Sequence, residues 1–477
     1  MGGHWADDDP VDVPYSAVEE NVWPAVPDDR AGRLLALLGQ FEDTQWWSPQ
    51  RLWEHQSQQL QRLLRHAQRT VPYYRQCLPA GLLQSGQTMD PAVWRQLPLL
   101  TRSALQSAGE SLLSRAVPAS HGGLHATRTS GATGQPVTVT TTGLAGLFWS
   151  VLALRDHRWQ RRKLSGKLCS IRAVVPAAAM RLPGIELPSW GAPTDAVYPT
   201  GRSALLGLSV EVGQQVQWLR SQRPQYLLTY PNNLRALAAR FIAEGTGLPG
   251  LLQVRTIGET VTQAIREDCR KAFGVELADA YSSEEVGGIA LQCPAGEGYH
   301  IQSESVLVEV LDDAGTPCAP GEVGRIVVTP LHNFAMPLLR YELRDYAEVG
   351  EPCHCGRGLP VLRRILGRSR NMLVLPNGER RWPLTGFAQF REIAPISQFQ
   401  FEQESLSLIE ARIVAERALS PFERTRLIET IQTALCHPFE IRIVEVAEIP
   451  RSANGKFEDF ISRLDASTPD RPRHEQN

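Results

Sequence analysis

The sequence has no long apolar run and no excess of charge of either sign, and each absence argues against a class of function. Its 477 residues include 49 Lys and Arg against 51 Asp and Glu, which gives a formal net charge of −2. Without a sustained basic stretch, the chain has no electrostatic footprint for nucleic acid. No stretch approaches the roughly 20 apolar residues that span a bilayer, so we expect no membrane partner.

A secretory leader is also lacking. Residues 1–10 have neither the basic start nor the apolar core of a signal peptide, and Ala6 stands where N-myristoylation requires Ser or Thr. We therefore expect a cytoplasmic protein. Its eight cysteines would then be reduced thiols or metal ligands rather than disulfides.

The composition is that of a soluble globular protein, with 42% hydrophobic and 21% charged residues, and the length allows at least two domains. Between residues 225 and 287, short apolar runs alternate with helical patterns, which predicts a parallel sheet. Ligands of such sheets bind beyond the carboxyl ends of the strands. Tyr230, Glu259, Tyr281 and Glu285 fall at these ends, so we expect them along one rim.

The pattern changes twice further along the chain. From about Val306 the sequence predicts antiparallel strands, and from about Gly367 it mixes helix and strand. We expect an α/β fold with a large N-terminal domain over residues 1–366, in which helices flank mostly parallel sheets beside a β-rich subdomain. A small α+β domain would follow over residues 367–477. Its polar tail after about residue 466 is expected to be disordered.

Residues 127–136 form a loop rich in glycine and hydroxyl groups between two stretches that we expect to be β-strands. Gly131 and Gly134 let the backbone approach a ligand or adopt positive φ, and the loop hydroxyl and N–H groups can donate to phosphate oxygens. It is not a Walker A loop, because GxxxxGK[ST] is absent and a strand follows. The alternative is an ordinary Gly/Ser hairpin loop.

Several further motifs follow this loop in a recognisable order. The loop resembles the phosphate-binding signature of adenylate-forming enzymes, with Gln135 where many members carry lysine. Five later segments resemble other signatures of these enzymes: residues 258–260, 281–285, 340–345, 367–372 and 449–457. From about Glu42 to Leu464, the chain resembles the phenylacetate-CoA ligase branch of this superfamily, and especially its capsule-gene-type relatives.

The resemblance implies a nucleotide site. The loop residues that would bind the phosphates of ATP are Ser130, Gly131, Ala132, Thr133 and Gly134, with Thr133 also assigned to catalysis. The residues that would surround adenine are Gly258, Glu259, Thr260, Tyr281 and Ser282. Asp345 would accept from the two ribose hydroxyls, which suits an ionised carboxylate, and Arg344 and Arg368 would lie near the nucleotide.

Glu285 and Lys456 carry the catalytic chemistry that the resemblance implies. Mg²⁺ on a triphosphate needs carboxylate oxygens, which suits Glu285, and Lys456 would stabilise charge that develops between the acid and the α-phosphate. The alternatives are that Glu285 caps a turn, that Asp345 belongs to a structural Asp–Arg pair and that Lys456 is a solvated loop lysine. The resemblance also implies a hinge near residues 367–372, although the acidic hinge residues of the family are replaced, and a mobile C-terminal domain.

Cys293, His300, Cys353 and Cys355 form a separate group of metal-ligand types. Three thiolates and one imidazole suit a closed tetrahedral zinc site, which would be structural because no coordination position stays open. Their split spacing is not that of a standard zinc finger. The alternative is a set of unrelated thiols and a surface histidine.

The leading hypothesis from the resemblance is a ligase that joins a carboxylic acid to ATP, giving acyl-AMP and pyrophosphate, and then transfers the acyl group to coenzyme A. One alternative passes the acyl group to a carrier-protein thiol or an amine. Another is a nucleotide-binding homologue without catalysis, which Gln135 favours. We expect an aromatic acid in a pocket that draws on Trp149, Tyr230, His332 and Asn333. A homodimer is expected from the family alone.

Overall fold

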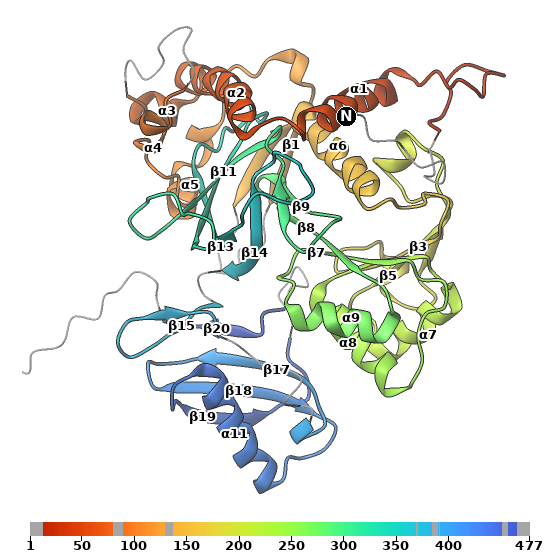
Figure 1. The fold of residues 1–477 in the computed structure, drawn as a ribbon, viewed down its shortest axis with the longest axis vertical. Coiled ribbons are helices and arrows are strands. Elements are labelled where there is room, and N and C mark those ends of the chain that lie inside the picture. Colours follow the sequence, from red (N-terminus) through yellow and green to blue (C-terminus); the bar gives the residue numbers. More distant parts are fainter. Residues whose placement is uncertain are drawn as a thin grey trace, which may run out of the picture.

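The computed structural model describes residues 13–79, 89–128, 137–368, 371–383, 390, 392–450 and 457–464. The loop residues from Ser130 to Gly134, Lys456 and the tail after residue 466 lie outside these ranges. Figure 1 shows a larger N-terminal part and, beneath it in blue, a smaller C-terminal sheet with a helix on it. The two parts are described in turn.

The helices lie mostly in the N-terminal part. Their bounds are α1 (Asp29–Thr44), α2 (Pro49–Thr70), α3 (Pro72–Cys77), α4 (Pro91–Arg95), α5 (Arg102–Ala108), α6 (Gly143–Trp159), α7 (Val212–Gln222), α8 (Pro231–Ala243), α9 (Gln263–Phe273) and, in the C-terminal part, α11 (Pro421–Leu435). Short 3₁₀ turns cover Gly109–Leu112, Ala119–His121, Ala177–Met180 and Thr194–Ala196. Among the described helices, none combines the length and the apolar character that crossing a membrane requires.

The N-terminal strands are β1 (Leu124–Arg128), β2 (Thr138–Thr142), β3 (Leu168–Arg172), β4 (Ile185–Leu187), β5 (Ser203–Gly207), β6 (Tyr226–Thr229), β7 (Gln253–Ile257), β8 (Leu277–Ser283), β9 (Gly287–Gln292), β10 (Tyr299–Ile301), β11 (Val306–Leu311), β12 (Val323–Pro330), β13 (Tyr341–Val349) and β14 (Val361–Arg368). Strands β1 and β2 form a separate hairpin, with residues 129–136 between them.

The other twelve strands form one sheet in the order β11-β12-β13-β14-β10-β9-β8-β7-β6-β3-β5-β4. Strands β3, β5, β6, β7 and β8 pair in parallel, as the alternating pattern predicts. Strand β9 then turns back antiparallel to β8, and the antiparallel strands continue from it. The α/β prediction is confirmed, and the parallel and β-rich regions are halves of a single sheet.

Each half of the sheet has its own hydrophobic core. The parallel half buries apolar residues of α7, α8 and α9, including Leu234, Leu237 and Phe241 at helical spacing on α8. The antiparallel half packs against α2 and the short helices after it. Burying one apolar stripe of each helix leaves the opposite faces and the strand ends for other contacts.

The C-terminal part is an α+β unit with a third core. Its strands are β15 (Leu373–Val374), β16 (Arg380–Arg381), β17 (Ile396–Gln403), β18 (Leu408–Ala415), β19 (Glu440–Glu445) and β20 (Phe460–Ser462), and four of them form a sheet in the order β19-β18-β17-β20. Helix α11 begins with a capping box in which Ser420 and Glu423 bond reciprocally. Its buried side chains belong to a core separate from the other two.

Candidate functional site

The carboxyl ends of β6, β7 and β8 form one rim, because these three strands are parallel neighbours. Tyr230 follows β6 as the N-cap of α8, and Glu259 follows β7 one residue after Gly258, whose φ is +79°. Tyr281 lies near the end of β8. The structure therefore places these sequence-predicted residues at neighbouring strand ends.

Tyr281 and Asp345 contact each other directly at this rim. The Tyr281 hydroxyl donates to Oδ2 of Asp345 at 2.7 Å, and Nε of Arg368 lies 3.8 Å from Oδ1 of the same carboxylate. Burial, and then the adjacent carboxylate, hold the pKa of Tyr281 well above its usual range, so the phenol stays a donor. Strands β8, β13 and β14 thus bring together three residues that are far apart in the sequence.

The segment at residues 340–345, at the start of β13, contains one buried arginine and one exposed arginine. Arg340 is buried, pairs with Glu309 at 3.0 Å and donates to the carbonyl of Leu97, so it fixes the start of β13. Arg344 is exposed, with φ of +64°. Ser282 lies on β8 opposite Gly288.

Glu285 forms an ion pair that the sequence did not indicate. Nη1 of Arg102, the first residue of α5, donates to Oε1 of Glu285 at 3.1 Å, and both side chains are mostly buried. The turn after β8 is capped by Ser283 instead, whose Oγ accepts from the amide of Val286 at 3.2 Å. The side chain of Glu285 is therefore engaged with a cation rather than with the turn.

Glu259 binds two backbone amides. Its Oε2 accepts from the amide of Asn232 at 3.0 Å, and its Oε1 accepts from the amide of Phe457 at 2.9 Å. A Cβ on Gly367 would lie 3.1 Å from Oγ1 of Thr260, so the turn after β7 adjoins the end of β14. The carboxylate of Glu259 thus holds a segment of the C-terminal part.

Further contacts attach the same C-terminal segment to α8. Arg235 reaches both carboxylate oxygens of Asp459, at 3.2 and 3.3 Å, and Nδ2 of Asn232 donates to the carbonyl of Phe457 at 3.3 Å. We call Asn232, Arg235 and Glu259, with residues 457–459, the latch. Its C-terminal segment begins one residue after Lys456 in the sequence.

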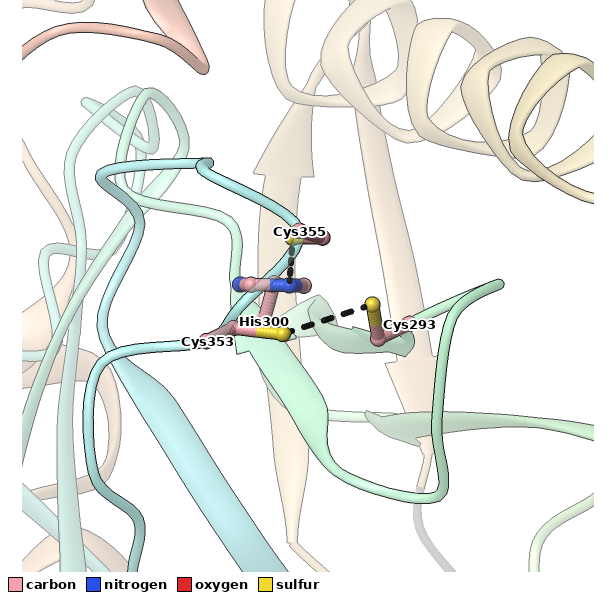
Figure 2. A group of neighbouring side chains, drawn as sticks. All are labelled: Cys293, His300, Cys353 and Cys355. Carbon is pink, nitrogen blue, oxygen red and sulfur yellow. Dashed lines mark hydrogen bonds between the residues drawn. The ribbon is translucent and has the colours of Figure 1, made fainter.

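Figure 2 shows the four predicted zinc ligands converging from three segments. Cys293 follows β9, His300 lies on β10, and Cys353 and Cys355 lie between β13 and β14. The two sulfurs of Cys293 and Cys353 are 3.7 Å apart, Sγ of Cys355 is 3.3 Å from Nε2 of His300, and all four ligand atoms lie within 4.8 Å of one another. Tetrahedral Zn–S bonds of about 2.3 Å place neighbouring sulfurs about 3.8 Å apart, so the cluster fits the ion.

The surroundings of this thiol cluster orient its imidazole and act differently on its thiols, since burial raises the pKa of Cys293 to about 12. A proton on Nδ1 of His300 donates to the carbonyl of Leu359 at 3.3 Å, which leaves Nε2 facing the thiols. Burial lowers the pKa of His300 to about 4, so the ring is neutral. Burial opposes the thiolate of Cys355, but hydrogen bonds from Arg357 bring its pKa below the ordinary value. His300 is fully buried, so the alternative of a surface histidine is wrong.

The four residues expected in an acyl pocket make different local contacts. Tyr230 is buried at the rim, where its hydroxyl accepts from the amide of Ala173 at 3.4 Å, and Trp149 covers Gly287 and Gly288 of β9. Asn333 is buried and donates to the carbonyls of Thr140 and Met336, so it braces a loop. His332 stacks on Phe148 in a hollow that is also lined by residues of α2. The assignment of these four residues to an acyl pocket stays a prediction.

Comparisons with known proteins fit this geometry, although no family model matches the chain. The sequence is 26% identical over 421 residues to a phenylacetate-coenzyme A ligase of Escherichia coli, covering 83% of this chain and 92% of that protein. It is 34% identical over 215 residues to the ligase of that name from Thermus thermophilus, covering 42% of this chain and 48% of that protein. The alignment therefore spans about half the length of the Thermus relative.

The fold is similar to solved structures of other ligases. For 2-hydroxyisobutyryl-CoA ligase in its postadenylation state, the TM-score is 0.68 at 19% identity, with 87% of this chain and 90% of that one covered. For the anthranilate CoA ligase AuaEII, the TM-score is 0.51 at 15% identity, with 70% and 65% covered. The similarity to phenylacetate-CoA ligases that the motifs predict is thereby confirmed, and the chain has the fold of these CoA ligase structures.

Proposed function

We propose that this relative of the phenylacetate-CoA ligases activates a carboxylic acid with ATP, forming acyl-AMP and pyrophosphate, and transfers the acyl group to the thiol of coenzyme A. The contact between Tyr281 and Asp345 carries the proposal. A carboxyl group and an aromatic ring thus lie together beside the carboxyl end of β8, and nucleotides bind at such strand ends in parallel sheets. The names of the relatives, and the order of motifs along the chain, support the same reaction.

Asp345 would accept from both ribose hydroxyls, and Tyr281 would hold the carboxylate in position while its ring packs on adenine. Arg368, beside Asp345, adds positive charge on the phosphate side. The loop residues from Ser130 to Gly134, with Thr133 closest to the chemistry, would supply donors to the phosphate oxygens. Such preorganised donors stabilise charge that develops as pyrophosphate leaves.

Glu285 offers the carboxylate oxygen that Mg²⁺ needs. The Glu285 carboxylate suits this ion, but its Oε1 already pairs with Nη1 of Arg102 at 3.1 Å. Mg²⁺ and Arg102 would therefore compete for this carboxylate. A released guanidinium would be free to pair with the triphosphate, for which its planar fork is well suited. When bound, the ion would neutralise the departing pyrophosphate.

The latch would present Lys456 to the site. Because Glu259, Asn232 and Arg235 hold residues 457–459 at the rim, the preceding residue in the sequence, Lys456, would enter beside the same strand ends. A lysine there can bridge the substrate carboxylate and the α-phosphate. The domain that begins near residue 367 would release the latch and rotate before the thiol attacks the acyl-AMP.

The thiol cluster would hold a structural Zn²⁺. Cys293, His300, Cys353 and Cys355 supply four ligands, so no position stays open for a substrate. Its role would be to tie the loop between β13 and β14 to the ends of β9 and β10. The chemistry of the nucleotide site does not require it.

The test is ATP–pyrophosphate exchange with Mg²⁺ against a panel of aryl and short acyl acids, on wild type and Lys456→Ala. Acid-dependent exchange that falls at least a hundredfold in the variant is the expected result, because the lysine acts in the adenylation step. ATP binding without exchange for any acid would favour the non-catalytic homologue. Offering coenzyme A, a carrier-protein thiol or an amine to the preformed acyl-AMP then identifies the acceptor, and light scattering tests the homodimer.

A further inference from the structure

A hollow of about 720 Å³ lies away from the nucleotide rim. Helix α2, residues 116–121, the start of α6 and the segment after β12 form its walls. It adjoins the open end of the β1–β2 hairpin, where Leu124 pairs with Thr142, whereas the chain connects the two strands beyond Arg128 and Thr138, at the other end. Five strand residues separate the two ends by about 16 Å. The hollow is therefore a separate feature from the proposed nucleotide site.

One wall of the hollow is a row of arginines on α2. Arg62, Arg65 and Arg69 recur at spacings of three and four residues, which places them on one helix face. Arg62 and Arg69 are exposed, and Arg65 donates to Oε1 of Gln61 at 3.3 Å. Within the described part of the chain, none of the three forms an ion pair. Three guanidinium groups thus face this hollow without a carboxylate to neutralise them.

Three histidines line the same hollow. Nε2 of His66 binds the carbonyl of Phe334 at 2.9 Å, and Nδ1 of His121 is buried without a hydrogen-bond partner among the described residues. Burial lowers the pKa of His66, His121 and His332, and the charges of His121 and Arg69 lower that of His66 further. No carboxylate contributes to these shifts. The local field is positive, and His121 still has hydrogen-bonding capacity to offer.

Aromatic rings complete the lining. The ring of His332 stacks on Phe148 at 3.6 Å, and the ring of Phe334 contacts those of His66 and His121 at 4.9 and 4.7 Å. Flat apolar surface beside a cationic wall is suited to a ligand that has a ring and anionic groups. A purely inorganic anion would leave the aromatic part of the hollow unused.

We propose that this hollow binds an organic phosphate, a small molecule with two or more phosphate groups on a flat body. Arginine is suited to this ligand because its guanidinium pairs with phosphate in a bidentate geometry. Arg62 and Arg69 lie seven residues apart, about 10 Å along the helix axis, so a ligand with several anionic oxygens contacts the row better than one phosphate does. The volume falls in the range of small-molecule sites, about 300–1,000 Å³.

The test uses inorganic tripolyphosphate as the probe and the ring NMR signals of His66 and His121 as the local readout. These signals report on the hollow alone, so binding of the probe at the glycine-rich loop does not interfere. The test variant is Arg62→Glu with Arg69→Glu. The matched control is Arg30→Glu with Arg33→Glu, which reverses two exposed arginines on α1.

We expect saturable shifts of both histidine signals in wild type and in the control, and at least tenfold weaker binding in the test variant. Unshifted signals in wild type, or equal affinity in both variants, would overturn the proposal. Shifts caused by hexaglutamate and not by tripolyphosphate would also overturn it, in favour of an acidic protein partner. Pyrophosphate exchange and thermal unfolding of each variant establish that it is folded. Failure of the proposed ligase activity would leave the binding result intact.

Discussion

The rim at the carboxyl ends of β6, β7 and β8 and the thiol cluster lie on the same sheet but are built in opposite ways. The cluster draws its four ligands from β10 and the loops next to it, and its histidine is fully buried. The rim draws on both parts of the chain, and two of its carboxylates, Glu259 and Glu285, bind groups that a reaction cycle would have to displace. The cluster is suited to holding one ion permanently, whereas the rim is suited to exchanging the partners of its carboxylates.

The largest effect on the protein is expected from removing one ligand of the thiol cluster. Cys353→Ser should remove bound zinc and lower the free energy of unfolding by on the order of 4 kcal/mol, because a metal-stabilised loop loses its anchor. Atomic absorption and urea unfolding measure the two quantities. Cys436→Ser is the control, since Cys436 is exposed and outside the cluster. A zinc content near zero in wild type would contradict the metal assignment.

At the rim, Asp345→Ala should lower kcat/KM for ATP about a hundredfold, because two hydrogen bonds from ribose to a charged acceptor are lost. Steady-state exchange at varied ATP gives the value. The control is Arg95→Ala at an exposed position on α4, which should lower kcat/KM less than about threefold because only a surface charge is removed. Equal losses in the two variants would argue against a ribose contact by Asp345.

A variant that weakens the latch should affect the two half-reactions differently. Asp459→Asn weakens the bidentate pair with Arg235 and should slow pyrophosphate exchange about tenfold, as expected for the loss of a charge-assisted contact. Thioester formation from preformed acyl-AMP should change little, because the proposed cycle would release the latch before that step. Arg240→Met, which removes an exposed pair on the same helix, is the control. Equal slowing of both half-reactions would indicate a merely structural contact.

The smallest effect concerns Arg102. Arg102→Met should lower the Mg²⁺ concentration for half-maximal exchange by about two- to fivefold, since a competing ion pair of 0.5–1 kcal/mol is removed. Titrating Mg²⁺ at saturating ATP gives this midpoint. Glu285→Gln should move the midpoint in the opposite direction. An unchanged midpoint in Arg102→Met would show that the pair does not limit metal binding.

The sequence was informative wherever one local pattern carried the answer. Alternating apolar runs predicted the parallel strands and the polar residues at their ends, and ligand chemistry predicted the thiol cluster. The latch and the partner of Glu285 could not be predicted, because Arg235 meets Asp459, and Arg102 meets Glu285, across some two hundred residues without a shared motif.

The strand order β14-β10-β9 has a mechanical consequence. Strand β9 runs between Glu285, at one end, and Cys293, at the other, and β14 begins six residues after Cys355 and finishes at Arg368. With zinc bound, β9 would be held at its Cys293 end, about 20 Å from its Gly287 end, and β14 would be held through the loop that carries Cys355. Neither strand could shift its register without moving a metal ligand. The ion would therefore help to fix the positions of the residues proposed to bind magnesium and ribose.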